Sequence, residues 1–374
     1  MVLLENLSYD ARKNVAGRPT LEKISYEGNI GRARMSELYR MFYVSGPGNG
    51  TMLSLPFDQL VEHGVGHCLA WERSADARAV IELGNRGNFS ALALSIGQAE
   101  KYQNLIRPDL PLLVKVDGHF LAGKDIPHYR HATMSSVERA VEAGANAIGF
   151  TFYLGGEETE EDIERVAKIV EEAHRYGKPV FMWAYTRGPL PDKMGADSLY
   201  WCAQGISAAE SFGVDVVKQK FPMPAKNIEA YKQNLGKFMD KKEDVYSKLD
   251  KISEKKGYLY SKMPDVSKLL ELEPQNPKDV SYELHVKRLA FMSAVAPNLL
   301  KIISGGPKAE NPEKELIETT RAVMDSGCEG RIVGRNFWAR PIKEALSLVE
   351  RVVGIMRQPE YSRILTEPRF TGKY

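Results

Sequence analysis

Short apolar runs alternate with amphipathic helical stretches along the chain from about residue 51. The stretch Glu158–Tyr176 illustrates the helical part of the pattern, since Ile163, Val166, Ala167, Val170 and Ala173 recur at a helical spacing. The apolar runs between such stretches are short and rich in residues that favour strands. Together they predict parallel strands joined by crossover helices, and so an α/β fold.

Eight of the apolar runs have the length and composition of buried strands. A chain with eight βα units is predicted to close into a (β/α)8 TIM barrel, whose chemistry lies at the C-terminal ends of the strands. Loops after the seventh and eighth strands of such barrels commonly bind phosphate. The predicted strands are Thr51–Phe57, Phe89–Ser95, Leu112–Val116, Ala147–Tyr153, Pro179–Tyr185, Val214–Lys220, Asn298–Ser304 and Gly330–Gly334.

Two segments exceed what a minimal barrel needs. Residues 1–50 end in the glycine-rich stretch Ser45–Gly50 and are expected to form an N-terminal extension that packs on the barrel. The connection Pro222–Pro297 between strands six and seven is longer than one crossover requires, and its charged middle, Asn234–Gly257, favours solvated helices. We therefore expect a barrel over residues 51–357, a helical insertion at about 226–285 and a C-terminal tail at 358–374.

Composition favours a small-molecule ligand. The chain of 374 residues has 51 basic and 49 acidic side chains, a balance that gives no field strong enough to attract nucleic acid or an anionic membrane. No run approaches the roughly 18 apolar residues of a membrane helix, and the charged start is unlike a signal peptide, so a cytoplasmic location is expected. Cys68, Cys202 and Cys328 are odd in number and far apart, as expected of packing thiols.

The candidate nucleophile is Lys218, near the end of the sixth predicted strand. Burial among apolar residues disfavours a charged amine, so it lowers the pKa and makes the neutral, nucleophilic form available near neutral pH. This pattern indicates Schiff-base chemistry, although a lysine at a strand end can also simply reach solvent. Lys115 fits a neighbouring charge that lowers the pKa of Lys218, whereas Lys301 is expected deeper in the barrel or on its outer wall.

Other predicted strand ends carry groups that could converge on one substrate. They are Asp58 and Gln59 after strand one, Trp183, Tyr185 and Arg187 on one face of strand five, and Lys220 on the same face as Lys218. Tyr185 and Asp58 suit the proton transfers that imine formation and carbon–carbon cleavage require. The alternatives are a core tyrosine and a helix N-cap aspartate.

Two glycine turns indicate a phosphate site. Strand seven runs into Ser304, Gly305 and Gly306, and strand eight runs into Gly334 and Arg335. Adjacent glycines let backbone N–H groups approach a ligand, arginine can donate two parallel hydrogen bonds, and a following helix N-terminus adds positive potential.

A metal-dependent alternative rests on His63 and His67, four residues apart. Gly64 and Gly66 argue against the helix that would place both imidazoles on one face. No third ligand follows at a suitable spacing, because His128 and His131 belong to a different loop. We therefore expect no metal cofactor.

Taken in order, these motifs resemble those of the class I fructose-bisphosphate aldolases of the archaeal and bacterial type, a family that also contains autoinducer-processing aldolases. The resemblance spans the barrel, and Val245–Leu249 in the long connection is similar to the longer bacterial branch. The segments that carry it are Leu55–Gly64, Trp183–Arg187, Ala208–Lys220, Ser304–Gly306 and Gly334–Arg335.

The resemblance implies a role for each matching residue. Lys218 would be the Schiff-base lysine and Tyr185 the proton donor and acceptor, in a homo-oligomer. His67 stands where the family often has an acidic residue. The implied substrate contacts are Asp58, Gln59, His63, Trp183, Gln219 and Lys220, with phosphate at Ser304, Gly305, Gly306, Gly334 and Arg335.

The expected reaction is the reversible, metal-independent cleavage of fructose 1,6-bisphosphate to dihydroxyacetone phosphate and glyceraldehyde 3-phosphate, in glycolysis and gluconeogenesis. Lys218 attacks the C2 ketone, Tyr185, aided by Asp58, removes the C4 hydroxyl proton, and the iminium accepts the electron pair released by cleavage. A transaldolase-like or acyl-transfer reaction on another phosphorylated sugar, a non-catalytic phosphosugar-binding protein and a zinc aldolase are the alternatives.

Overall fold

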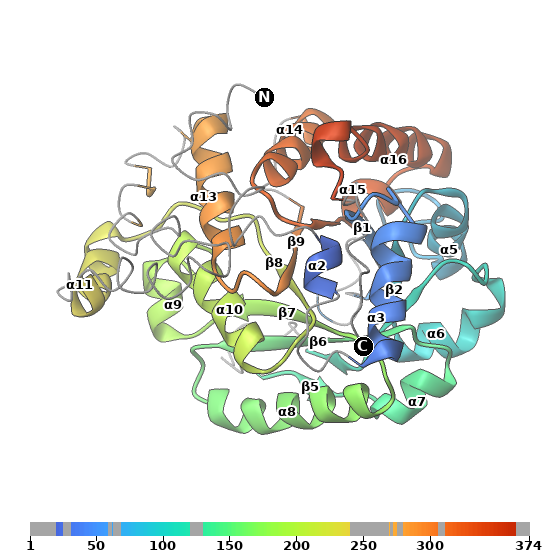
Figure 1. The fold of residues 1–374 in the computed structure, drawn as a ribbon, viewed down its shortest axis with the longest axis horizontal. Helices are drawn as coiled ribbons and strands as arrows, with labels where there is room; N and C mark the ends of the chain where they lie inside the picture. Colours follow the sequence, from blue (N-terminus) through green and yellow to red (C-terminus); the bar gives the residue numbers. More distant parts are fainter. Residues whose placement is uncertain are drawn as a thin grey trace, which may run out of the picture.

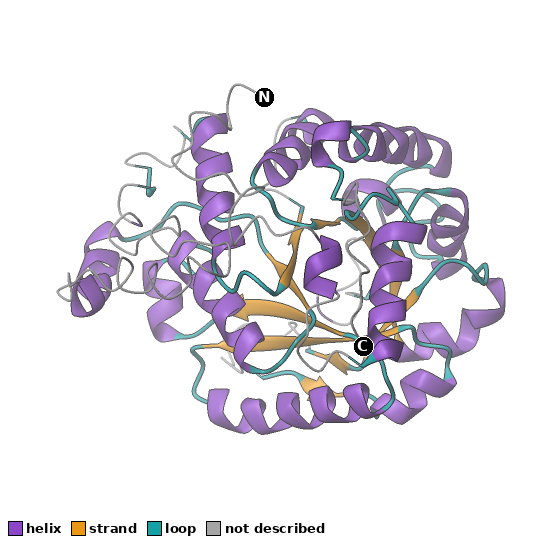
Figure 2. Ribbon diagram, viewed as in Figure 1, coloured by secondary structure: helices purple, strands orange, loops and turns teal. Residues whose placement is uncertain are grey.

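A closed barrel of eight parallel strands, surrounded by helices, forms the body of the molecule (Figure 1, Figure 2). The computed structural model describes residues 20–24, 31–58, 62, 69–119, 130–239, 269, 272–274, 280–305 and 311–363. Strands neighbour one another in the order β1-β10-β9-β8-β7-β6-β3-β2, so each pairs with the next barrel strand along the chain and the last pairs with the first. The predicted (β/α)8 fold is confirmed.

Each barrel strand overlaps one of the eight predicted runs. Between β3 and β6, a small antiparallel sheet pairs β4 (Asp117–Gly118) with β5 (Ala132–Thr133), which the sequence pattern did not predict. The barrel strands are β1 (Met52–Pro56), β2 (Ala91–Ser95), β3 (Leu112–Lys115), β6 (Ala147–Leu154), β7 (Val180–Thr186), β8 (Val216–Gln219), β9 (Leu300–Ser304) and β10 (Gly330–Ile332).

Helices follow the barrel strands and cover the outside of the barrel (Figure 2). They include α5 (Ala77–Arg86), α6 (Ile96–Tyr102), α7 (Val137–Glu142), α8 (Thr159–Arg175), α9 (Pro189–Met194), α10 (Leu199–Ser211), α14 (Pro312–Asp325), α15 (Arg335–Trp338) and α16 (Ile342–Met356), with 3-10 turns at Gln103–Leu105 and Pro359–Tyr361. Two further helices, α11 (Ile228–Met239) and α13 (Tyr282–Ala294), lie in the long connection between β8 and β9, whose residues 240–257 fall outside the described part. Among the helices described, none is long and apolar enough to cross a membrane.

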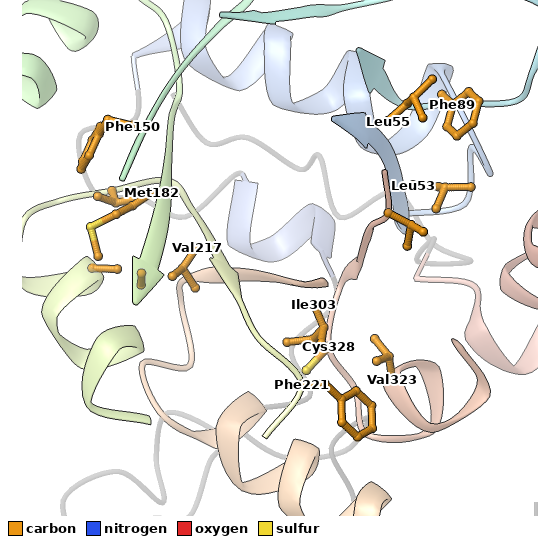
Figure 3. Packing of buried hydrophobic residues seen from close by; sticks show 14 of the residues in the cluster. Leu53, Leu55, Phe89, Phe150, Met182, Val217, Phe221, Ile303, Val323 and Cys328 are labelled. Carbon is orange, nitrogen blue, oxygen red and sulfur yellow. The ribbon is translucent and has the colours of Figure 1, made fainter. Parts of the chain in front are cut away.

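Alternation along the strands divides the core into two layers. Outward side chains pack against the helices; Figure 3 shows part of this layer, with Leu53, Val217 and Ile303 on strands and Val323 on α14. Inward side chains, among them Trp183, fill the barrel. Because side chains fill its interior, the barrel is a packed core, and polar chemistry is confined to its end.

The segment before β1 covers the N-terminal end of the barrel. Its helices α2 (Thr20–Ile24) and α3 (Arg32–Tyr39) and the π-helical turn Arg40–Val44 add Ile24, Leu38, Met41 and Phe42 to the inner core layer. Glu37 accepts hydrogen bonds from Asn146 and Lys178, which precede β6 and β7. The opposite, C-terminal end therefore carries the loops available for chemistry.

Helix α8 corrects one expectation about which side faces the core. Its bounds match the predicted helix, but Ile163 is 38% exposed and Ala167 is exposed. Asp162 and Arg165 are buried instead, because they belong to a polar cluster at the C-terminal end of β3. Because the polar cluster needs Asp162 and Arg165 on the buried side of α8, the side that faces the core is shifted by about one residue from the predicted apolar stripe.

Candidate active site

Lys218 extends into the barrel from β8. Val216 belongs to the inner layer and Val217 to the outer one, so alternation directs Lys218 inward. It pairs with Trp183 of β7 on one side and with β9 on the other. Its Nζ atom lies 4.9 Å from the centroid of the Trp183 ring and 5.8 Å from that of Tyr185. An aromatic pocket therefore encloses the amine, which leaves the residue only 8% exposed.

Burial lowers the pKa of Lys218 to about 8, from an ordinary lysine value of 10.5. The positive charges of Lys115 and Lys220 contribute to this lowering of the pKa, whereas the carboxylates of Asp58 and Glu62 oppose it. A useful fraction of the amine is therefore neutral near physiological pH. This electronic state is the one that nucleophilic attack on a carbonyl requires.

Tyr185 lies beside the amine, on the same face of β7 as Trp183, as predicted. Burial raises the pKa of Tyr185 well above its ordinary value, and the negative charges of Glu62 and Asp58 act in the same direction. Its phenol is therefore protonated before substrate binds. The indole Nε1 of Trp183 is buried and has no hydrogen-bond partner among the described residues, so it can donate to a substrate.

Arg187 and Lys220 share one counterion, Asp197. The Lys220 Nζ atom donates to both carboxylate oxygens of Asp197, at 2.8 and 2.9 Å, and Arg187 Nη1 donates to one of them at 3.3 Å. The Arg187 guanidinium carbon also lies 5.8 Å from the ring centroid of Tyr153 and 5.9 Å from that of Tyr185. Arg187 and Asp197 also line a pocket of about 570 Å³, together with Asp192, Gly195, Ala196, Met223, Pro224, Ala225 and Lys226.

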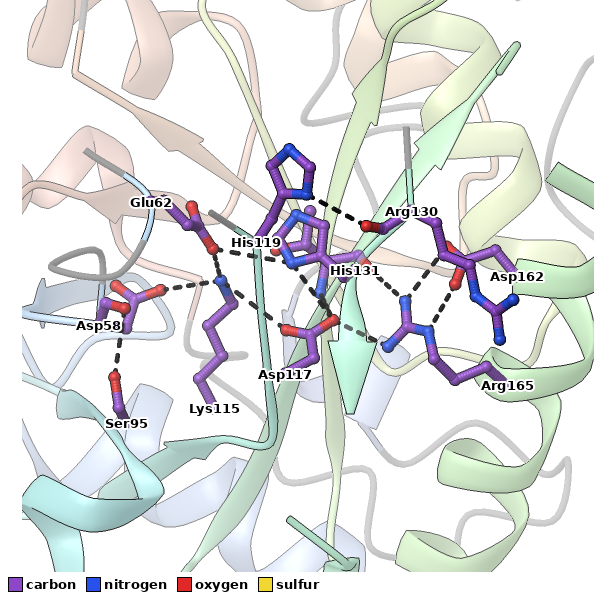
Figure 4. Close-up of polar contacts among 11 residues, drawn as sticks. Asp58, Glu62, Ser95, Lys115, Asp117, His119, Arg130, His131, Asp162 and Arg165 are labelled. Atoms are coloured by element: carbon purple, nitrogen blue, oxygen red, sulfur yellow. Dashed lines mark hydrogen bonds and ion pairs between the residues drawn. The ribbon is translucent and has the colours of Figure 1, made fainter. Parts of the chain in front are cut away.

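A buried cluster of charges surrounds Lys115 of β3 (Figure 4). Its Nζ atom donates to Glu62 and lies 3.7 Å from carboxylate oxygens of both Asp58 and Asp117. Burial disfavours the charge, but Asp117, Glu62 and Asp58 together raise the pKa of Lys115 above its ordinary value. Lys115 is therefore a permanent cation and a poor nucleophile, and it lowers the pKa of Lys218 as the sequence suggested.

The far side of this cluster is held by α8. Arg165 Nη1 donates to Asp117 Oδ2 at 2.9 Å, and its Nε donates to Asp162 at 2.5 Å. The same Asp117 oxygen accepts a hydrogen bond from the backbone N–H of Thr151 at 2.9 Å. These contacts fix Asp117, and through it the cation of Lys115, in one position.

The two glycine turns adjoin at the C-terminal ends of β9 and β10. A side chain on Gly334 would lie 2.8 Å from the carbonyl oxygen of Pro56, and one on Gly305 would lie 3.2 Å from Asn336 Oδ1, so close approach requires glycine at Gly334. Ser304 is half-buried and Arg335 is exposed. The helix that follows, α15, has four residues, and its dipole adds less potential than the sequence suggested.

One expected substrate contact is wrong. Gln219 is the neighbour of Lys218 on β8, so alternation turns its side chain outward, where Nε2 donates to the carbonyl of Cys202 at 3.0 Å. Its Oε1 accepts from the backbone N–H of Lys220 at 2.7 Å. Gln219 thus anchors β8 to α10 and positions Lys220. Three other expected contacts, Gln59, His63 and Gly306, lie outside the described residues, as does His67.

Lys301 shows that a low pKa does not by itself identify a nucleophile. Burial, reinforced by the charge of Lys23, lowers the pKa of Lys301 to about 7, below that of Lys218. Its Nζ donates to the carbonyls of Ala296 and Leu299, at 2.7 and 2.9 Å, in the loop before β9. Lys301 therefore lies on the outer wall at the opposite end of the barrel from the site.

Several residues of the site were missed by sequence reasoning. They come from a loop, a two-residue strand pair, a helix and a strand end, which only the fold brings together. They are Glu62, Asp117, His131, Arg165, Tyr153 and Asp197. One signal was available for Asp117, because Lys115 and Asp117 are both charged within an apolar stretch. Within the described ranges, no group of three or more metal-ligating side chains could hold a metal ion.

A parallel barrel with a buried, partly neutral lysine at the C-terminal end of its sixth strand is the arrangement of a Schiff-base enzyme. Residues 52–256 match the DeoC/LacD family of aldolases, and the chain belongs to this family of class I aldolases.

Proteins with curated names align with most of this chain. A probable class 1 fructose-bisphosphate aldolase of Chlamydia muridarum is 27% identical over 322 residues, 84% of this chain and 82% of that protein. The class 1 fructose-bisphosphate aldolase of Thermoproteus tenax is 25% identical over 307 residues, 82% and 90% of the two chains. A 2-amino-3,7-dideoxy-D-threo-hept-6-ulosonate synthase of Halobacterium salinarum is 36% identical to this chain over a shorter stretch of 86 residues, which is 23% of this chain.

Solved structures share the fold. An archaeal fructose 1,6-bisphosphate aldolase superposes with a TM-score of 0.62 at 23% identity, covering 85% of this chain and 99% of the other. The fructose-bisphosphate aldolase of Slackia heliotrinireducens gives a TM-score of 0.63 at 19% identity, covering 87% of each chain.

Proposed function

We propose that this chain is a class I aldolase that reversibly cleaves fructose 1,6-bisphosphate to dihydroxyacetone phosphate and glyceraldehyde 3-phosphate, in glycolysis and gluconeogenesis. The observation that carries the proposal is the Lys218 amine, buried against Trp183 and Tyr185 with a pKa of about 8. The names of the relatives that align over more than four-fifths of the chain support the substrate. A cytoplasmic location and a homo-oligomeric state remain predictions.

In the proposed reaction, the neutral Lys218 amine adds to the C2 ketone, and the carbinolamine hydroxyl takes the phenol proton of Tyr185 and leaves as water, which gives an iminium ion and a Tyr185 phenolate. Tyr185, aided by Asp58, then takes the proton of the C4 hydroxyl as the C3–C4 bond breaks. The electron pair of that bond moves to the iminium and leaves an enamine, and glyceraldehyde 3-phosphate departs. Protonation at C3 and hydrolysis release dihydroxyacetone phosphate and free Lys218. No metal is needed, since the iminium accepts the electron pair.

Two parts of the site support recognition of a phosphorylated sugar. The turns with Ser304, Gly305, Gly334 and Arg335 adjoin one another and would bind the phosphate nearest the ketone, with Gly306 as a further proposed contact. Trp183 contributes a buried indole N–H on the inner face. His63 and Gln59 remain proposed contacts on the segment after β1.

A second candidate reaction rests on the match to the heptulosonate synthase. The chain would then keep the Schiff base on Lys218 but transfer the bound fragment to a different acceptor, as a transaldolase-like or acyl-transfer enzyme. The buried amine serves either reaction equally well, because both begin with imine formation. Substrate preference separates them.

The test is a coupled assay of aldehyde and triose-phosphate release from a panel of phosphorylated sugars, with and without chelator. We expect fructose 1,6-bisphosphate to be cleaved fastest, chelator to have no effect, and Lys218→Ala to lose at least about a thousandfold in kcat while its circular dichroism stays that of the wild type. Preference for another sugar would favour the second reaction. A folded Lys218→Ala protein with near-normal turnover would refute the proposal.

A further inference from the structure

Trp338 is a buried tryptophan at the C-terminal end of the four-residue helix α15, which begins at Arg335 of the proposed phosphate site. It is 2% exposed, and the proposed mechanism gives it no role. The strand β10 ends at Ile332, so Gly334 and Arg335 lie beyond the hydrogen-bonded sheet. A single helical turn has little stability of its own, because it fixes several backbone angles for few hydrogen bonds. Contacts from elsewhere in the fold must therefore hold α15 and Arg335 in place.

The indole of Trp338 binds the end of β1. Its Nε1 atom donates to the carbonyl oxygen of Pro56 at 3.1 Å, and its ring meets the ring of Phe57 edge to face, with centroids 5.1 Å apart. Asp58, the proposed aid to Tyr185 in proton transfer, directly follows these two residues. Trp338 thus joins the helix of the phosphate site to the strand end that leads into Asp58.

Gly334 makes this approach possible. A Cβ atom at this position would lie 2.8 Å from the Pro56 carbonyl oxygen and 2.9 Å from Trp338 Nε1, so a larger residue would push the strand end and the indole apart. The carbonyl oxygen of Gly334 accepts hydrogen bonds from the backbone N–H groups of Phe337 at 2.8 Å and Trp338 at 3.1 Å. The hydrogen bond from the indole to Pro56 therefore lies directly against the backbone of the phosphate turn.

Trp71 holds the same helix at its other end. Its Nε1 atom donates to the carbonyl oxygen of Trp338 at 2.9 Å. This carbonyl is at the C-terminus of α15, where helix carbonyls lack partners within the helix. In the sequence, Pro56 and Trp71 flank the segment after β1, on which Gln59 and His63 remain proposed contacts. Both flanking residues are thus hydrogen-bonded to Trp338.

We propose that Trp338 is a positioning residue that fixes the phosphate turn to the end of β1, and so to the barrel that carries Lys218. The inference rests on the proposed function. Binding energy at a group remote from the reacting carbon raises the rate only if the protein holds the two sites in a fixed geometry. Without the indole hydrogen bond, phosphate can still bind at Gly334 and Arg335, but it no longer places the ketone in one position. The rate advantage of a phosphorylated ketone over an unphosphorylated one should therefore fall.

Two variants remove one hydrogen bond each. Trp338→Phe keeps an aromatic ring against Phe57 but removes the N–H that binds Pro56. Trp71→Phe removes the N–H that binds the Trp338 carbonyl and, because Trp71 is half-buried, disturbs the core less. The matched control is Trp201→Phe in α10, since Trp201 is also buried but its Nε1 atom has no hydrogen-bond partner among the described residues.

The rate of imine formation, trapped with borohydride, is measured with dihydroxyacetone phosphate and with dihydroxyacetone, which lacks the phosphate. We expect Trp338→Phe to lower the ratio of the two second-order rate constants at least about tenfold, and Trp71→Phe at least about threefold, with the dihydroxyacetone rate nearly unchanged. Trp201→Phe should leave both rates unchanged. Circular dichroism shows which variants are folded. A general loss of structure would lower both rates together, so the ratio reports positioning.

Three outcomes would overturn the inference. An unchanged ratio in either folded variant would show that the phosphate turn is positioned without the hydrogen bonds of Trp338. A parallel fall of both rates would assign Trp338 a role in folding alone. Absence of an imine with dihydroxyacetone phosphate in the wild type would instead refute the proposed function, and the inference with it.

Discussion

The Nζ atom of Lys218 lies 4.9 Å from the centroid of the Trp183 ring, and the two residues are direct partners in the pairing of β8 with β7. The register of the barrel therefore fixes this contact, because paired positions on parallel strands direct their side chains to the same face. Lys115 approaches the same ring, at 6.0 Å. One indole thus lies near two lysines of different character, a partly neutral nucleophile, Lys218, and a permanent cation, Lys115.

Replacement of Lys115 with methionine should move the pH dependence of imine formation. The wild-type rate should rise with pH through about 8, since the neutral amine of Lys218 reacts. Lys115→Met removes a cation that lowers the pKa of Lys218 and leaves Asp58 and Glu62 unneutralised, so the rise should shift to higher pH and activity at pH 7 should fall. Stopped-flow imine formation between pH 6 and pH 10 measures the shift.

Lys115→Arg is the matched control for charge. It keeps the cation and should keep the wild-type midpoint, even if its larger head group lowers stability. An unchanged midpoint in a folded Lys115→Met protein would contradict the proposed influence of Lys115 on Lys218.

Replacement of Tyr185 with phenylalanine should separate imine formation from cleavage. The variant keeps the ring beside Lys218 but loses the hydroxyl whose raised pKa keeps it protonated. We expect kcat to fall about 10²- to 10⁴-fold, with little change in the amount of imine trapped at saturation. An effect confined to KM would contradict the acid–base role.

Replacement of Arg335 with alanine should weaken phosphate binding. A charge-assisted hydrogen bond from arginine to phosphate contributes about 1.5–3 kcal/mol, so KM should rise roughly 10- to 100-fold with a smaller change in kcat. The control is Lys343→Ala, which removes an exposed cation from the nearby helix α16. Equal effects of the two variants would point to general electrostatic attraction, and would refute a specific contact at Arg335.

Lys301 should make stability depend on pH. Its pKa is about 7 in the folded protein against an ordinary 10.5, so between these values the unfolded chain binds more protons. Stability should therefore rise with pH across this window. The difference in the free energy of unfolding between the wild type and Lys301→Met should grow by about 1–2 kcal/mol from pH 7 to pH 9, measured by urea denaturation. A constant difference would show that Lys301 is not buried with a lowered pKa.

The barrel could be predicted from sequence because strands buried on both faces read as continuous apolar runs. All eight predicted runs overlap barrel strands, within one or two residues at most ends. The β4–β5 pair escaped because two-residue strands leave no periodic signal. In α8 the pattern gave the bounds, but burial of Asp162 and Arg165 shifted the core-facing side, which no apolar period can indicate.

The site could be predicted where one strand carries several residues. Alternation placed Trp183 and Tyr185 on the inner face, and the same rule, applied to Gln219 beside Lys218, would have directed it outward to Cys202. The resemblance implied that Gln219 contacts the substrate along with its neighbours Lys218 and Lys220, and for Gln219 this prediction was wrong. Glu62 and His131 could not be found, because only tertiary contacts bring a loop and a strand pair to Lys115.

The central claim is that Lys218 forms the covalent intermediate, and borohydride reduction in the presence of dihydroxyacetone phosphate tests it most directly. The reduced protein is digested and the modified peptide is identified by mass spectrometry. We predict one adduct, on Lys218, which lies against Trp183. An adduct on Lys115, Lys220 or Lys301 in its place, or no adduct in folded protein, would contradict the account.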